Sequence, residues 1–144
     1  MTPLCAIEFP EIVLIRLDRF NTIKRVWIVE FTDEFGEWFQ SLTDRQQDTI
    51  DRYVRLLEEL GPGLGRPYVD TVKGSRHPNM KELRTQSRGR PLRTFFAFDP
   101  RRTAILLIGG DKSGNKRFYD EMIPIADRLY EQYLRELRRE GLIP

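Results

Sequence analysis

Residues 73–119 read KGSRHPNMKELRTQSRGRPLRTFFAFDPRRTAILLIGGDKSGNKRFY, and this stretch decides the fold. Three runs in it, at residues 80–84, 92–98 and 103–110, have strand composition and are separated by turn residues. Because no helical pattern lies between them, the runs predict an antiparallel meander. The third run is apolar almost throughout, which predicts a central strand that is buried on both faces.

The connections within this stretch also carry signals. Residues 86–90, which include a glycine, predict a polar turn between the first two strands, and Asp99-Pro100 predicts the turn before the third. Side chains alternate between the two faces of a strand, so Arg84 is expected to share a face with Glu82.

The chain before this stretch predicts a strand followed by a helical hairpin. Residues 26–31 are β-branched and aromatic, which is typical of a strand. Apolar residues then recur on one helical face in two successive segments, and glycines at residues 61–63 end the second. These residues are Phe35, Trp38, Phe39 and Leu42 in the first segment, and Ile50, Tyr53, Val54, Leu57 and Leu60 in the second.

A last helix closes the chain. Pro124 is a favoured first helical position, and Gly141 predicts the end of the helix. Together the patterns predict an α+β fold, with an N-terminal strand and a helical hairpin packed on a small antiparallel sheet, and a C-terminal helix. At 144 residues we expect one domain, spanning residues 26–140. Residues 1–25 are predicted to be a dispensable N-terminal extension, although an extra strand around residues 12–15 stays open.

Positive charge is concentrated in one part of the chain. Between Leu64 and Tyr119 there are 13 basic and 4 acidic residues, a net charge of +9, whereas the remainder carries 11 basic and 18 acidic residues. A cationic sheet surface predicts a polyphosphate partner. One cysteine and one histidine argue against a disulfide and against Cys- or His-rich metal sites. No apolar run reaches the roughly 20 residues of a membrane span. We therefore expect a cytoplasmic protein without metal or cofactor.

Several short sequence motifs, in their order along the chain, resemble those of the RelE superfamily of toxins, and within it those of the phage-derived HigB-like family. They are KELR at 81–84, RTFFAFD at 93–99, ILL at 105–107 with GGDK at 109–112, and KRFY at 116–119 leading into IPIA at 123–126. The resemblance spans residues 26–137 and implies a RelE-like fold. It also implies the toxin of a type II toxin–antitoxin pair, which cleaves messenger RNA, usually in the ribosomal A site, and so inhibits translation. The implied partner is a helix-turn-helix antitoxin, through which the toxin reaches operator DNA.

The resemblance also implies site residues. Arg84 and Arg93 correspond to arginines on neighbouring strands, Lys112 to a basic residue after the last core strand, and Tyr119 to a residue near the C-terminal helix. HigB-like toxins often have a catalytic histidine at that end, whereas His77 lies upstream of the ELR strand. The assignment of the general acid and base therefore stays open.

These residue types suit metal-independent RNA cleavage, which needs a base, a proton donor and stabilisation of the phosphorane charge. A guanidinium can hold phosphate oxygens bidentately, and the unperturbed pKa of histidine, about 6.5, suits proton transfer. Clustered cations are expected to ease ionisation of Tyr119 or of Lys73, Lys81 or Lys112. The residues predicted to bind RNA are Lys73, Arg76, Lys81, Arg88, Arg90, Lys116 and Arg117. Arg101 and Arg102 are predicted to be solvated surface charges in a turn.

Two other functions stay open at this point. A ParE-like protein with the same fold would inhibit DNA gyrase by protein contact, and a binding module would hold nucleic acid without cutting it. The surface that meets the antitoxin is also open, between the basic face from Lys81 to Tyr119 and the helix that carries Phe35, Trp38 and Phe39.

Overall fold

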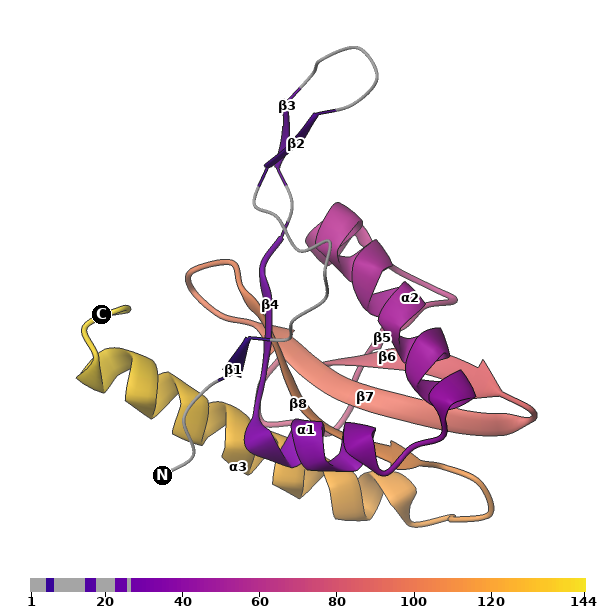
Figure 1. The fold of residues 1–144 in the computed structure, drawn as a ribbon. Helices are drawn as coiled ribbons and strands as arrows, with labels where there is room; N and C mark the ends of the chain where they lie inside the picture. Colours follow the sequence, from indigo (N-terminus) through magenta and orange to yellow (C-terminus); the bar gives the residue numbers. More distant parts are fainter. Residues whose placement is uncertain (1–4, 7–14, 18–22, 26) are drawn as a thin grey trace.

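In the computed structural model of the chain, residues 5–6, 15–17, 23–25 and 27–144 are described (Figure 1). A six-stranded sheet has the order β1-β4-β8-β7-β6-β5, and β2 and β3 form a separate two-stranded sheet. The strands are β1 (Cys5–Ala6), β2 (Ile15–Leu17), β3 (Ile23–Arg25), β4 (Val29–Phe31), β5 (Val69–Thr71), β6 (Lys81–Ser87), β7 (Arg90–Phe98) and β8 (Ala104–Asp111). The helices are α1 (Asp33–Gln40), α2 (Asp44–Leu60), the short 3-10 helix η1 (Gly61–Gly63) and α3 (Phe118–Arg139).

The predicted α+β, RelE-like architecture is confirmed, including the antiparallel meander β6-β7-β8. The predicted central strand, β8, lies between β7 and β4, and it runs parallel to β4. The first strand is shorter than residues 26–31, and Val26 lies outside the described residues. Trp27 lies before β4, and its N–H donates to the carbonyl of Glu58 in α2 rather than to a neighbouring strand.

The turn between β6 and β7 is shorter than predicted. Ser87 pairs with Arg90 and Gln86 with Pro91, so the strands continue through most of residues 86–90. Only Arg88 and Gly89 form the turn, and both have positive φ angles, 50° and 77°. Two residues of this conformation match the right-handed twist of a hairpin, which lets the ladder run to its tip.

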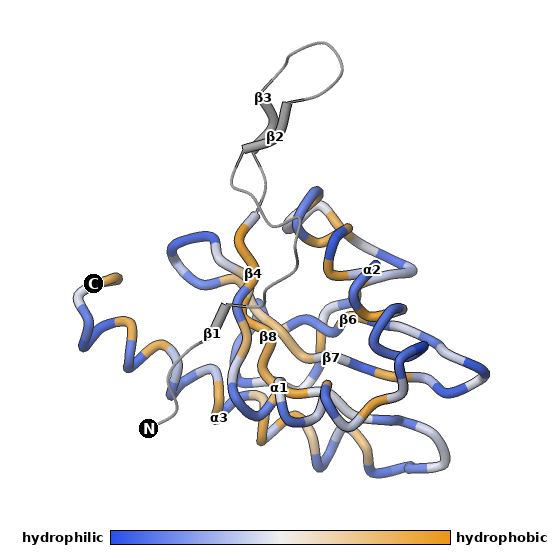
Figure 2. Tube along the Cα trace, viewed as in Figure 1, coloured by the Kyte–Doolittle hydropathy of each residue, from blue (hydrophilic) through white to orange (hydrophobic). Residues whose placement is uncertain are grey.

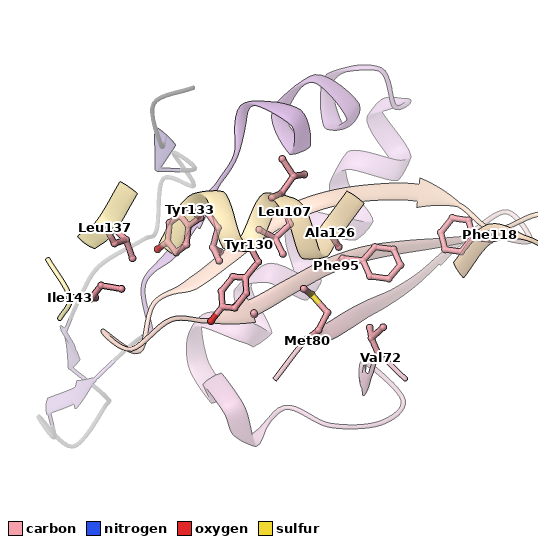
Figure 3. Close-up of a cluster of buried hydrophobic side chains, with 13 residues drawn as sticks. Val72, Met80, Phe95, Leu107, Phe118, Ala126, Tyr130, Tyr133, Leu137 and Ile143 are labelled. Carbon is pink, nitrogen blue, oxygen red and sulfur yellow. The ribbon is translucent and has the colours of Figure 1, made fainter. Parts of the chain in front are cut away.

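The helices cover the two faces of the sheet and bury a separate core on each. On one face α1 and α2 pack against residues such as Leu83, Phe96 and Leu106. On the other face α3 packs against Phe95 and Leu107, and Figure 3 shows this second cluster. Figure 2 shows hydrophobic residues gathered along β7 and β8, between these layers.

The helical hairpin is confirmed, with one exception in its apolar face. Thr32 caps α1 by accepting from the Phe35 N–H, and Thr43 with Gln46 forms a capping box at α2. Leu60 was predicted to belong to the buried stripe but is 52% exposed. It is the last residue of α2, where Gly61 at φ 55° turns the chain away.

The start of the last helix was predicted wrongly. Helix α3 begins at Phe118, and Pro124 lies exposed inside it. Phe118 is buried and its ring stacks on Phe95 at 6.0 Å, which fixes the first turn of the helix on the sheet. Gly141 does end the helix, at φ 75°, with the N–H groups of residues 141 and 142 returning to carbonyls of the last turn.

Two adjacent glycines in β8 allow both helical layers to approach closely. A Cβ atom on Gly109 would lie 2.2 Å from the Trp38 ring of α1, and one on Gly110 would lie 2.9 Å from Phe118. Such contacts are shorter than real Cβ contacts, so neither position has room for a side chain. Gly110 in particular lets the start of α3 rest directly on the strand.

The predicted boundary between residues 1–25 and the domain at 26–140 stays a prediction. Of the run at residues 12–15, only Ile15 lies among the described residues, in β2. No described helix has both the length and the apolar character that a membrane span requires.

Candidate active site

Arg84 and Arg93 lie directly opposite each other on β6 and β7. Glu82 and Phe95 form the pair two residues further along, on the same face of the sheet, as the alternation of side chains requires. Like charges directly opposite are unfavourable, so this pair needs nearby carboxylates. Asp70 Oδ2 lies 3.7 Å from Arg84 Nη1, and Glu82 Oε1 lies 3.6 Å from Arg93 Nε.

Arg93 is buried but incompletely satisfied. Its residue is 7% exposed, and Nη1 donates to the carbonyl of Leu92 at 3.0 Å. Its Nε has no hydrogen-bond partner within the described structure. The nearest described acceptor is the Glu82 carboxylate, which lies just beyond hydrogen-bond distance at 3.6 Å. Arg93 Nε is thus held by an ion pair rather than by a direct hydrogen bond.

Tyr119 reaches this cluster from the first turn of α3. Its hydroxyl donates to Glu82 Oε1 at 2.8 Å, and its ring meets Phe95 edge to face at 6.2 Å. Burial, and then the hydrogen bond to Glu82, raise the pKa of Tyr119, although Arg93 acts in the opposite direction. The expectation that neighbouring cations ease its ionisation is wrong, because a half-buried phenol that donates to a carboxylate keeps its proton.

Lys112 completes the group from the end of β8. Its Nζ lies 5.4 Å from the centroid of the Tyr119 ring, within cation–π range. The structure therefore brings together four of the five residues predicted to be catalytic, Arg84, Arg93, Lys112 and Tyr119.

His77 lies elsewhere. Its Nε2 is 2.9 Å from Glu131 Oε2, and its ring meets Tyr130 edge to face at 5.0 Å. Glu131 is twelve residues beyond Tyr119 on α3, so about 18 Å separate them along the axis at 1.5 Å per residue. The loop of His77 is also held there by Asp127, which accepts from Ser75 Oγ and from the Arg76 N–H. His77 therefore lies apart from the cluster of Arg84, Arg93, Lys112 and Tyr119.

The residues predicted to bind RNA are dispersed. Arg76 is paired with Glu131, Arg90 with Asp111 at 2.8 Å, and Lys81 donates to Thr71 Oγ1. The others are exposed: Lys73, Arg88, Lys116 and Arg117.

Arg101 was predicted to be a solvated charge, and this is wrong. Its guanidinium contacts Glu30 at 3.0 Å and Asp99 at 3.1 Å, and it donates to Tyr133 Oη at 2.9 Å. Arg102, the other residue of that turn, is exposed and lies over the Trp27 ring at 4.3 Å.

The sequence reasoning missed Glu82 and Asp70 as members of the site. Glu82 was placed on the same face as Arg84 but was not named as a site residue, yet its side chain is 8% exposed and contacts both Arg93 and Tyr119. The signal was present, because Glu82 and Arg84 are two residues apart in a strand and share a face. Among the described residues, no group of three or more His, Cys, Asp or Glu side chains is placed to hold a metal ion.

Comparison with known proteins assigns the family. Residues 37–131 match the family described as "Phage derived protein Gp49-like (DUF891)", which is more than half of the chain. The chain belongs to this phage-derived Gp49-like family. Together with the two HigB relatives described next, this match confirms the prediction of a phage-derived, HigB-like family.

Two curated relatives come from Mycobacterium tuberculosis (strain ATCC 25618 / H37Rv). The chain is 45% identical to "Putative toxin HigB2" over 104 residues, which is 71% of this chain and 52% of that protein. It is 52% identical to "Putative toxin HigB3" over 98 residues, which is 67% of this chain and 84% of that protein. The match thus spans about half the length of the first relative and most of the second.

Proposed function

We propose that this chain is the toxin of a type II toxin–antitoxin pair and acts as a metal-independent endoribonuclease on messenger RNA, in a ribosome-dependent reaction that inhibits translation. The observation that carries the proposal is the incompletely paired guanidinium of Arg93, which faces Arg84 and adjoins the Glu82–Tyr119 hydrogen bond. The toxin names of both relatives support it, as does membership of the family.

The two arginines suit the scissile phosphate. A phosphate bound beside Arg84 and Arg93 would place negative charge between two like charges that face each other. Charge-assisted guanidinium–phosphate bonds are among the stronger hydrogen bonds in proteins. They strengthen further as negative charge develops on the phosphorane, so they stabilise the transition state.

Glu82 and Tyr119 supply proton transfer in this proposal. Glu82 accepts the proton of the ribose 2′-OH, whose oxygen then forms a bond to phosphorus. The bond from phosphorus to the 5′-oxygen breaks, and the leaving oxygen takes the phenolic proton of Tyr119. The products are a 2′,3′-cyclic phosphate and a 5′-hydroxyl. The raised pKa of Tyr119 suits this role, because a proton donor must remain protonated at neutral pH.

Lys112 and the exposed basic residues would bind the rest of the RNA. A cognate antitoxin is proposed as the protein partner, with operator DNA bound through it, and the cytoplasm as the compartment. Because translated RNA is the proposed substrate, the ribosome is the third proposed partner.

The test is induced expression in a bacterial host, with and without the neighbouring small gene, followed by mapping of messenger RNA 5′ ends. We expect growth arrest with new in-frame cuts inside translated codons, and relief of both by Arg93→Ala. Arg139→Ala, an exposed arginine in the last turn of α3, is the matched control. Arrest with DNA breaks and no RNA cuts would overturn the nuclease proposal and favour gyrase as the target.

A further inference from the structure

A cavity of about 390 Å³ lies between the start of α2 and the tip of the β6–β7 hairpin. At about 30 Å³ per water molecule it has room for roughly a dozen waters, and so for a phosphate with its ribose. Its lining includes three arginines, Arg45, Arg88 and Arg90, against one carboxylate, that of Asp44. The balance of charge favours an anion.

The arginines are available to a ligand. The guanidiniums of Arg45 and Arg88 are exposed and have no partner in the part of the chain that the structure describes. Arg90 is paired with Asp111, which largely neutralises its charge, so the site depends mainly on Arg45 and Arg88. Two free guanidiniums at one cavity are a usual arrangement for phosphate.

The backbone adds further donors. The capping box satisfies the N–H groups of Thr43 and Gln46. The capping box leaves the backbone N–H groups of Asp44 and Arg45 unbonded, because N–H groups in the first turn of a helix have no intrahelical acceptor. The positive end of the α2 dipole also lies here.

A serine hydroxyl at the cavity is a further possible donor. Ser87 lines the cavity and is 7% exposed, and its hydroxyl has no hydrogen-bond partner within the described ranges. The Ser87 oxygen is not among the described side-chain atoms that are both fully buried and unpaired, so it is accessible from the cavity and can donate to a ligand oxygen.

The cavity and the candidate active site lie on opposite faces of one hairpin. Ser87 is four residues from Leu83 in β6, so it lies on the same face of the sheet, which packs against α2. Arg84 and Arg93 lie on the other face, on the side of α3. The pair Arg84–Arg93 is three residues from the pair Ser87–Arg90, about 10 Å along the strands. An RNA strand would connect the two by passing around the tip, where Arg88 is exposed.

We infer that this cavity binds a backbone phosphate of the RNA substrate, a few nucleotides from the bond that is cleaved. The inference rests on the proposed function, since it takes RNA as the substrate. It adds a second phosphate site, contributed by α2 and by the far side of the hairpin, which fixes the path of the strand.

The test measures binding of a fluorescent 2′-O-methyl RNA dodecamer, which cannot be cleaved, by the full chain at several salt concentrations. The double variant Arg45→Ala, Arg88→Asn removes both guanidiniums; asparagine suits the positive φ of residue 88. We expect affinity to fall about tenfold and the salt dependence to lose a slope of about 0.7, for one phosphate contact on a single strand. Ser87→Ala, which changes no charge, should also weaken binding, and Arg139→Ala should change neither quantity.

A short RNA separates this inference from the proposed function. A 2′-O-methyl trimer that spans only the Arg84–Arg93 pair should bind the double variant normally and should lose affinity with Arg93→Ala. If the double variant keeps the affinity and salt dependence of the wild type for the dodecamer while Arg93→Ala does not, the second site is overturned and the proposed function stands. If Arg93→Ala alters neither binding nor cleavage, the proposed function itself fails. If inorganic phosphate shifts the amide resonances of Arg45 and Ser87 and the dodecamer does not, the cavity takes free phosphate, which also overturns the inference.

Discussion

Two clusters along α3 contain the same kinds of residue and differ in how completely they are satisfied. Near the start of the helix, Tyr119 meets Glu82 and Arg93; near its end, Tyr133 meets Arg101 and Asp99. In the second cluster both Asp99 oxygens accept hydrogen bonds, and Glu30 adds a second carboxylate for Arg101. In the first, Arg93 Nε has no acceptor among the described residues.

The difference separates a structural network from a functional one. Asp99 accepts hydrogen bonds from the β7–β8 turn and from α3, and Arg101 extends this network to Glu30 on β4, so the cost of burying Asp99 is offset by its bonds. The Arg93 cluster leaves a charged donor unsatisfied, which lowers stability unless a ligand completes it. Stability is therefore expected to depend on the second cluster, and activity on the first.

The largest effect is expected from Asp99→Ala. The Asp99 side chain is fully buried, and its removal leaves two backbone N–H groups without an acceptor and leaves Arg101 and Tyr133 with Glu30 alone. Breaking such a network should lower the free energy of unfolding by about 3–5 kcal/mol, measured by urea denaturation. Asp111→Ala, which removes a partly exposed carboxylate from Arg90, is the control and should cost under about 1 kcal/mol. Equal losses in the two variants would contradict a structural role for the Asp99 network.

Arg93→Ala should affect RNA cleavage more than stability. We expect RNA cleavage to fall by about 10²–10³-fold, the usual cost of removing one donor to a developing negative charge. The urea midpoint should fall less than in Asp99→Ala, because Arg93 has fewer hydrogen bonds to lose. Arg93→Lys should not restore activity, since an ammonium cannot hold a phosphate bidentately. Full activity of the lysine variant would argue that only charge at this position matters.

Glu82→Gln should shift the titration of Tyr119. Burial and Glu82 raise the pKa of Tyr119 above the usual value of about 10. A group with a raised folded-state pKa stabilises the fold below its unfolded pKa and loses that contribution as the pH rises through the folded value. Removing the carboxylate should lower the pKa, so tyrosinate absorbance should begin at a lower pH. The Tyr119→Phe variant identifies this tyrosine among the others, and an unchanged titration would show that Glu82 does not hold the phenol.

The smallest effect is expected from His77→Ala. Its partner Glu131 lies about 18 Å along α3 from Tyr119, so cleavage should stay within about threefold of the wild-type rate. The same cleavage assay used for Arg93→Ala measures it. A loss of a hundredfold or more would place His77 in the reaction and contradict the division between the two ends of α3.

The sequence by itself determined the elements and the family. Period-two and helical patterns predicted the meander β6-β7-β8 and the hairpin α1-α2, because these patterns depend on neighbours within a few residues. It also named four residues that the fold brings together, Arg84, Arg93, Lys112 and Tyr119. The family match covers residues 37–131, and this range includes the sequence motifs from which the family was inferred.

Only the tertiary structure decided what each polar side chain meets. Glu82 bonds to Tyr119 across 37 positions, and His77 to Glu131 across 54, and neither contact follows from local periodicity. The start of α3 was missed for the same reason, since Phe118 is anchored by Phe95 rather than by a local cap. Hydrogen-bond partners and burial depend on which distant segments pack together, so the chemistry of Arg93, Tyr119 and Arg101 became visible only in the folded chain.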